Sequence, residues 1–413
     1  MVKKTSYQAG DQTMLRKINL SAIMNYIRIN APISRSTLAR KTGLNKATIT
    51  SLVSELINRN LIKEIGLKNN ALGRPSMNLT LNPDAGFIIG VEIGVDFINV
   101  IGTDFSPKEI SHVIVPTTLE MSVDEVLKEM IVRINNAVDE CKHKVGGNFL
   151  GLAVGVPGLV DYEEGTLLFA PNLKWHDVEL KKYLSPVFPV PIIIDNEANL
   201  ATYGEYYFGS AYQHPDVLYL SAGIGLGGGI LHDSTLLRGV NGKAGELGHI
   251  TMLPDGELCG CGNKGCWETL VSLRALYRYV QEQVATDKTT ELWKITGGNM
   301  NELTLEKIVA AAERGDRVAI VALTKVGRYI GIGIASLINA LNPSMVVFGG
   351  IMSSAWKFLE PVINSEISTR ALKWNRENTE VVLAKHGSDA CVIGGVASIY
   401  QATISQSIAG LRF

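Results

Sequence analysis

The sequence has 413 residues, of which 46% are hydrophobic and 19% charged. This length predicts two or three domains, and the composition excludes a fibrous or disordered chain. The net charge of -1 hides an asymmetry, because residues 1–82 carry 13 Lys/Arg against 3 Asp/Glu and residues 83–413 carry 26 against 37. The net charge of +10 in the first segment suits it to binding a polyanion, whereas the net charge of -11 in the rest does not.

Nothing in the sequence predicts targeting to a membrane. The N-terminal stretch MVKKTSYQAGDQ is polar and lacks the apolar segment of a signal peptide. The most apolar stretch, 329–352, is broken by Asn339, Asn342 and Pro343. We therefore expect a cytoplasmic protein without a membrane partner. In that reducing compartment the five cysteines are not expected to form a disulfide framework.

Three helices are predicted at the basic end. Apolar spacing predicts the first over residues 15–29, and Ala31-Pro32 ends it because proline disfavours helix in the preceding residue. Ser34 can cap a short second helix that stops at Gly43, and Asn45 can cap a third. A short helix, a glycine-containing turn and an amphipathic helix are typical of a helix-turn-helix, whose second helix enters the major groove of DNA.

The third helix has one apolar face and one face of small or hydrogen-bonding residues. The second face would approach base edges and phosphates with Lys46, Ala47, Thr48, Thr50 and Ser51. Arg35, at the start of the second helix, is a further candidate DNA contact. Two strand-like runs around a polar turn then predict a wing, with Arg74 placed to reach a minor groove or a phosphate. The alternative is a protein-interaction module with a solvated basic face, but charge, turn spacing and wing together favour DNA.

Beyond Gly86 the pattern changes to short apolar runs that end in glycine-rich turns and alternate with helical segments such as SVDEVLKEMIVRINNAVDE. The apolar runs are FIIGVEIG, NVIGTDF, FLGLAVGVPG, VPIIID, VLYLSAGIGLGGGIL and MVVFGG. This alternation predicts an α/β region with mixed sheets. A hairpin-like opening with glycine turns occurs twice, near Gly90 and near Gly223, which predicts two related lobes with a ligand cleft between them.

One histidine and three cysteines lie close together in the segment HITMLPDGELCGCGNKGCWETL. His249, Cys259, Cys261 and Cys266 supply one imidazole and three thiolates, a closed tetrahedral set suited to Zn²⁺. Because no ligand position is left for water, the predicted zinc is structural. The glycines between the thiols allow the zinc loop, residues 249–266, to fold around one ion. The alternative is three reduced thiols in a turn.

Several motifs, in a fixed order after the winged helix, resemble the ROK family of sugar kinases and sugar-responsive repressors. They are VGVPGLVD, DNEANLATYGE, GIGLGGG, and GELGH followed by CGCGNKGCWE, and the resemblance covers essentially the whole chain. EIGVDFINVIGTD and PNLKWHDVEL further resemble the xylose-repressor branch. The resemblance implies a winged helix-turn-helix over 1–82, a two-lobed actin-like, RNase H-like sugar-binding domain over 83–413, and a homodimer or homotetramer.

The resemblance also implies a set of sugar contacts. The matching positions are Gly158, Asn172, Asn196, Glu197, Glu246, His249 and Glu268. Zinc would fix the His249 ring through one nitrogen and leave the other for a sugar hydroxyl. Singly, each position has a structural alternative, since Pro-Gly is common in turns and an Asp-Asn-Glu run after a strand commonly caps a helix. As a set, carboxylates and amides converging on one cleft suit a ligand with many hydroxyl groups.

The phosphate loops depart from those of the family's kinases. EIGVD at 92–96 replaces Asp-x-Gly-Gly-Thr, so Val95 hinders close backbone approach and Asp96 places a negative charge near phosphate. Ala222 replaces a threonine before the second loop, and Glu197 stands at the catalytic aspartate position. We therefore expect a DNA-binding repressor without kinase activity that responds to a pentose, D-xylose first. The alternative is a DNA-binding protein that retains ATP-dependent sugar phosphorylation.

Overall fold

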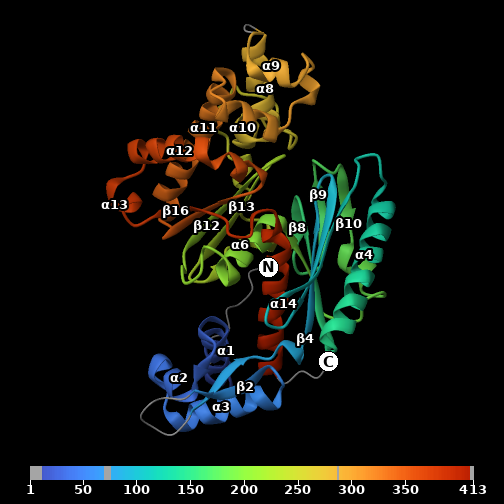
Figure 1. The fold of residues 1–413 in the computed structure, drawn as a ribbon, viewed down its shortest axis with the longest axis vertical. Helices are drawn as coiled ribbons and strands as arrows, with labels where there is room; N and C mark the ends of the chain where they lie inside the picture. The colour runs from blue at the N-terminus through green and yellow to red at the C-terminus, as the bar shows by residue number, and fades with distance from the viewer. Residues whose placement is uncertain (1–11, 69–75, 286–287, 410–413) are drawn as a thin grey trace.

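The computed structural model describes residues 12–68, 76–285 and 288–409. Figure 1 shows a helical unit with a small sheet at one end of the long axis and two lobes, each with its own sheet, above it. The winged helix thus lies beneath the two lobes (Figure 1).

The end unit has the helix-turn-helix and wing expected from the sequence. Its elements are α1 (Gln12–Asn30), β1 (Ile33–Ser34), α2 (Arg35–Thr42), α3 (Lys46–Asn58), β2 (Ile62–Lys68) and β3 (Ser76–Leu81). Two predicted caps are confirmed, since the Ser34 side chain accepts from the Thr37 N–H and the Asn45 side chain from the Thr48 N–H. Gly43 ends α2 with a φ of 72°, a conformation that favours glycine. Antiparallel β2 and β3 form the wing, and Arg74 lies outside the described residues.

The first lobe contains a five-stranded sheet in the order β11-β7-β4-β5-β6. Its strands are β4 (Gly86–Ile93), β5 (Phe97–Asp104), β6 (Glu109–Pro116), β7 (Asn148–Val156) and β11 (Ile192–Asn196). The 3-10 turn η1 (Pro83–Ala85) leads into it, and α4 (Val123–Val145) and α5 (Leu180–Leu184) pack on it. A separate three-stranded sheet, which the sequence patterns did not predict, contains β8 (Leu159–Asp161), β9 (Thr166–Ala170) and β10 (Trp175–Val178).

The second lobe contains a sheet in the order β14-β13-β12-β15-β16. Its strands are β12 (Val217–Ala222), β13 (Leu226–His232), β14 (Thr235–Leu236), β15 (Met345–Gly349) and β16 (Glu380–Leu383). Its helices are α7 (Glu268–Val271), α8 (Leu273–Val284), α9 (Glu291–Ile295), α10 (Leu305–Glu313), α11 (Arg317–Leu341), α12 (Trp356–Arg370) and α13 (Lys373–Arg376). Short 3-10 turns are η2 (Val240–Gly242), η3 (Leu247–His249), η4 (Met300–Glu302), η5 (Ile351–Ala355) and η6 (Gly387–Asp389).

The two large sheets have the same topology, which confirms the prediction of two related lobes. In each, the first strand pairs antiparallel with the next strand on one side and parallel with a later strand on the other. The hairpin expected near Gly90 is formed by β4 and β5, and its glycine turn begins at Gly94. Gly90 lies inside β4, where a Cβ would come within 2.2 Å of the Val392 carbonyl oxygen. This glycine therefore allows α14 to approach the sheet.

The helices α6 (Glu197–Phe208) and α14 (Ala390–Ala409) pack against each other. The shorter α6 lies on β12 and β13 of the second lobe, and α14 lies on β4 and β7 of the first lobe and reaches α1 (Figure 1). One hydrophobic core continues from the winged helix through β4 and β5 into α14, and it includes Ile23 and Met24 of α1 together with Val396 and Tyr400 of α14. The helix α11 is long and apolar enough to span a membrane, with a mean hydropathy of 1.6, and 61% of its apolar window is buried inside the protein. It is the central helix of the second lobe's core.

Candidate functional site

A cavity of about 380 Å³ lies where the two lobes meet. All seven positions that the sequence proposed as sugar contacts line it, namely Gly158, Asn172, Asn196, Glu197, Glu246, His249 and Glu268. They come from loops far apart in the sequence, at the ends of β7, β9 and β11 and around η3 and α7. The volume falls within the range of about 300–1,000 Å³ that small-molecule sites occupy.

The start of α6 brings two of these residues into the cavity. The Asn196 Oδ1 caps the helix by accepting from the Ala198 N–H at 2.8 Å, and its Nδ2 donates to the Gly158 carbonyl oxygen at 3.0 Å. Asn196 therefore caps α6, as the structural alternative for this position expected, and it also lines the cavity. Gly158 has a φ of 103°, and a Cβ there would lie 2.2 Å from the Phe169 carbonyl oxygen. Only glycine fits this position.

A buried ion pair supports the strand end just before Asn196. Asp195 Oδ2 accepts from Arg238 Nη1 at 2.6 Å, and the Arg238 guanidinium lies 3.7 Å from the ring centre of Tyr162. The other carboxylate oxygen, Oδ1, accepts from the Asn196 N–H and from Asn199 Nδ2. Burial raises the pKa of Asp195, and the Arg238 charge opposes that rise. The pair thus fixes the point where β11 turns into α6.

Carboxylates dominate the polar lining of the cavity. Burial raises the pKa of Glu197 to about 7, with a smaller contribution from the charge of Glu246. Burial also raises the pKa of Glu246, against the lowering effect of His249. A carboxyl group that titrates near neutral pH can donate or accept a hydrogen bond, which suits a hydroxyl ligand.

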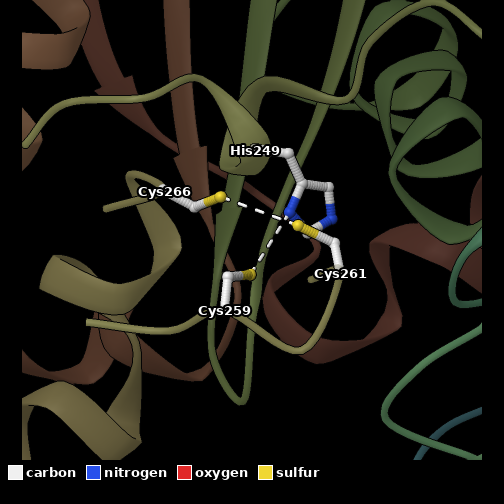
Figure 2. Close-up of side chains that lie close together, drawn as sticks. All are labelled: His249, Cys259, Cys261 and Cys266. Atoms are coloured by element: carbon white, nitrogen blue, oxygen red, sulfur yellow. Dashed lines mark hydrogen bonds between the residues drawn. The ribbon is translucent and has the colours of Figure 1, made fainter. Parts of the chain in front are cut away.

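The four predicted metal ligands lie together. Their ligand atoms are all within 4.8 Å of one another, so this cluster could hold a metal ion. Figure 2 shows Cys259 Sγ pointing at His249 Nδ1, 3.6 Å away, and Cys261 Sγ at Cys266 Sγ, 3.7 Å away. The second ring nitrogen of His249, Nε2, lies 3.8 Å from a carboxylate oxygen of Glu246. One nitrogen therefore faces the thiols and the other faces a residue of the cavity.

The cysteine-containing segment is anchored on the second lobe, and Glu268, just after it, lines the cavity as His249 does. Trp267 is fully buried, and its Nε1 donates to the Tyr329 carbonyl oxygen of α11 at 2.9 Å. In the next residue, Glu268 Oε2 accepts from the Leu226 N–H at 3.2 Å and Oε1 accepts from the Cys259 thiol at 3.2 Å. Glu268 thus joins the cysteine cluster to the glycine-rich turn between β12 and β13.

Residues 88–402 match the model of the ROK family. The chain belongs to the ROK family. A xylose repressor from Caldicellulosiruptor bescii is 35% identical to it over 396 residues, 96% of this chain and 98% of that protein.

Solved structures agree with this assignment. A ROK family transcriptional regulator, a homologue of the E. coli MLC protein, matches with a TM-score of 0.81 and 27% identity over 96% of this chain and 98% of its own. A ROK family glucokinase from Streptomyces griseus in complex with glucose and AMPPNP matches with a TM-score of 0.67 and 32% identity, covering 75% of this chain and 98% of its own. The expected actin-like fold preceded by a winged helix is thereby confirmed.

The cavity of this ROK protein has other lining residues that the sequence analysis missed or assigned differently. The sequence analysis named Glu92 only as part of a loop that departs from the kinase phosphate loop. In the structure Glu92 lines the cavity, with one carboxylate oxygen buried and without a hydrogen-bond partner among the described residues. Ser388 and Cys391 also line it, although they are distant in sequence from the recognised motifs. Burial raises the pKa of Glu92, and the charges of Glu197 and Asp389 raise it further. Only a three-dimensional arrangement could have revealed this grouping.

The charge of the lining is one-sided. The described residues around the cavity include five carboxylates, Glu92, Asp96, Glu197, Glu246 and Glu268, and no lysine or arginine. An anionic group such as a phosphate would find no lysine or arginine partner here, whereas a neutral polyhydroxy compound would find hydrogen-bonding carboxyl groups. Two of the departures from the kinase phosphate loops, Val95 and Asp96, lie on this same lining, whereas Ala222 is buried in β12 and is not among the lining residues.

The winged helix exposes three of the proposed DNA contacts, all on α3. Lys46, Thr50 and Ser51 are exposed on α3, and Thr48 is half-buried. Arg35, at the first position of α2, is half-buried and forms an ion pair of 3.0 Å with Glu64 of the wing. Arg35 would therefore have to exchange this carboxylate for a DNA phosphate, a competition that the sequence did not suggest.

Proposed function

We propose that this chain is a sugar-responsive transcriptional repressor that binds double-stranded operator DNA through its winged helix and takes a pentose, D-xylose first, as its effector. One observation carries the proposal. A continuous hydrophobic core joins a basic winged helix to the two-lobed domain, and the cavity of that domain is lined by acidic and amide side chains that suit a polyhydroxy ligand. The name of the C. bescii relative, xylose repressor, supports the choice of sugar.

The seven lining positions named from the sequence would contact the sugar, and α3 would contact the bases. Lys46, Thr48, Thr50 and Ser51 would meet the major groove, with Arg35 and Arg74 on the backbone or the minor groove. The protein would act in the cytoplasm as a homodimer or homotetramer, which would place two winged helices on a two-fold symmetric site.

The cysteine cluster would hold one structural zinc ion. Zn–S bonds of about 2.3 Å and Zn–N bonds of about 2.0–2.1 Å in a tetrahedron place ligand atoms about 3.5–3.8 Å apart. Two separations between cluster atoms, 3.6 Å and 3.7 Å, match these values, and all the ligand atoms lie within 4.8 Å of one another, which supports the fit. When bound, the zinc supplies a cross-link within the loop rather than catalysis.

Metal binding would also change the hydrogen bonding of Glu268. A coordinating thiol gives up its proton, so Cys259 could no longer donate to Glu268 Oε1. That oxygen would then be available to accept from a sugar hydroxyl. Zinc would in this way prepare the cavity as well as brace its wall.

Absence of kinase activity is part of the proposal. The Asp96 carboxylate, at a position where the kinases of the family carry threonine, lines the cavity, and no basic residue among the described lining offsets it. Retained sugar phosphorylation is the competing function, and the S. griseus glucokinase supports it through its similarity in fold.

The response to sugar would work by a shift between two arrangements of the lobes. An effector can change DNA affinity only if it binds one arrangement more tightly than the other. We expect the sugar to favour a closed cavity, which respaces the paired winged helices away from their half-sites.

The test combines a sugar screen with a DNA-binding assay. Thermal-shift measurements with pentoses and hexoses identify the ligand, and operator affinity is then measured with and without saturating sugar at fixed salt. D-xylose should raise the melting temperature and lower operator affinity. A response to glucose or an N-acetylated hexosamine instead would refute the pentose assignment, and binding of ATP with magnesium but of no sugar would refute the repressor function.

A further inference from the structure

The helix α6 connects the cavity to the winged helix. Its first residues, Asn196 as the cap and Glu197 as the first helical position, line the cavity. Its last residues, Tyr207 and Phe208, lie at the far end, which twelve residues at about 1.5 Å each place about 18 Å away. Most of the helix is buried, so a displacement at one end is transmitted to the other rather than absorbed.

Arg28 of α1 docks on that far end. Its Nη1 donates to the Tyr207 carbonyl oxygen, and its guanidinium lies 5.0 Å from the ring centre of Tyr207 and 5.3 Å from that of Phe208. The ring of Tyr212 is a third neighbour at 5.9 Å. Burial lowers the pKa of Arg28, and its Nε has no hydrogen-bond partner within the described part of the chain.

The C-terminal end of α6 is a favourable site for the positive charge of Arg28. The last carbonyl groups of a helix carry partial negative charge, and aromatic faces attract a cation. The guanidinium is partly removed from water and interacts with these groups instead, so its stabilisation depends on the position of the end of α6. A small movement of α6 would leave Arg28 badly solvated unless α1 moved with it.

The neighbouring helix α14 prevents α6 from moving alone. A Cβ on Gly394 would lie 1.7 Å from the Leu200 carbonyl oxygen, and a Cβ on Gly204 would lie 2.5 Å from that of Ala390. The two helices are therefore in backbone contact. Further along α14, the Tyr400 ring packs on Phe208, with ring centres 6.3 Å apart, and belongs to the core that includes α1. Figure 1 shows α14 extending from the region between the lobes down to α1.

We infer that Arg28 couples the effector cavity to the winged helix: sugar bound at the start of α6 displaces the helix, and Arg28, held on the other end, carries α1 with it. The inference rests on the proposed function and names its route of regulation. Arg28 contacts neither the cavity nor the DNA-facing side of α3, so it is a positioning residue whose removal changes the coupling between two binding events.

The test compares variants of Arg28 with a control in the same helix. Arg28→Ala removes the contact, and Arg28→Lys keeps the charge but loses the planar group that stacks on the rings. Arg16→Ala is the matched control, because Arg16 Nε donates to Glu55 Oε2 at 3.0 Å within the winged helix. For each chain, operator affinity is measured with and without saturating D-xylose, and D-xylose affinity with and without operator.

Coupling between binding sites typically changes affinity about 5- to 150-fold. Wild type and Arg16→Ala should show the same factor within this range, whereas Arg28→Ala should reduce it to less than about threefold and Arg28→Lys to an intermediate value. Operator affinity without sugar and sugar affinity without operator should each stay within about threefold of wild type. By reciprocity, the effect of operator on sugar affinity should fall by the same factor.

The outcomes separate this inference from the function on which it rests. A wild-type chain that binds operator but ignores every sugar refutes the proposed function. A wild-type chain that responds, with Arg28→Ala and Arg28→Lys responding to the same extent, refutes the coupling role alone. Loss of both affinities with an unchanged coupling factor shows a merely structural arginine and also overturns the inference. If circular dichroism shows that Arg28→Ala does not fold, Arg28→Lys decides.

Discussion

Replacing Arg238 by methionine should strip the buried Asp195 carboxylate of its charge partner. The Asp195 side chain is 2% exposed and that of Arg238 22%, so the pair is held away from solvent. Removing one partner of a buried pair costs about 3–5 kcal/mol, because the remaining charge is left uncompensated. The same loss should disturb Asn196, whose N–H donates to Asp195 Oδ1. Arg238→Met should therefore weaken sugar binding as well as stability.

The loss should depend on pH with a defined sign. Burial already raises the pKa of Asp195, and Arg238 opposes that rise. Without Arg238 the pKa in the folded state moves further above the unfolded value of about 3.9. The folded variant then favours the protonated acid, so its free energy of unfolding falls as the pH rises from about 4 through that raised pKa. The deficit relative to wild type should be larger at pH 8 than at pH 5.

Urea unfolding of both chains at these two pH values measures the effect. The control is Arg133→Met, because Arg133 pairs with Glu129 on the surface of α4, where both side chains are about one-third exposed. This loss should cost less than about 1 kcal/mol at either pH. The double variant Asp195→Asn with Arg238→Met should recover part of the stability at pH 8. If Arg238→Met loses no more than the control, or loses equally at both pH values, the pair does not contribute as argued.

Further outcomes can be checked directly. Removing metal with a strong chelator should release about one zinc per chain and weaken D-xylose binding in calorimetry; equal affinity in the metal-free protein would contradict the bracing role. Glu246→Ala should abolish the sugar response in a DNA-binding assay while operator affinity stays unchanged. Since burial raises the pKa of Glu197 to about 7, the free energy of unfolding should fall between about pH 4.5 and 7 in wild type and less so in Glu197→Gln, as urea midpoints would show. Lys46→Ala should weaken operator binding and reduce its salt slope by about one phosphate contact in a titration series; an unchanged slope would argue against a phosphate contact.

Features that depend on neighbours in sequence could be predicted from the sequence. Ser34, Gly43 and Asn45 delimit α2 and α3 through hydrogen bonds and backbone angles within a few residues, and the structure places all three as expected. The spacing of His249 and the cysteines likewise indicated a cluster, and their ligand atoms lie within 4.8 Å of one another. The glycine-rich runs indicated both lobes, because their strands and turns are local patterns.

Features that depend on distant segments could not be predicted. Gly90 allows the backbone of α14 to approach a strand about 300 residues away in sequence, a contact that no local pattern indicates. Cys391 reaches the cavity through α14, and Arg28 meets the end of α6, with no local pattern to suggest either. The pairing of Arg35 with Glu64 depends on how the wing folds back on α2.

The continuous core beneath the lobes has a consequence for exchanging parts between relatives. Ile23 and Met24 are fully buried in a core to which Val396 and Tyr400 belong, so the DNA-reading unit is completed by the last helix of the chain. A chimaera cut at residue 82 would join two surfaces that evolved against other partners. To redirect this protein to a new operator, a protein engineer should replace only the α3 side chains proposed to contact DNA, or else transfer the second half of α14 together with the new winged helix.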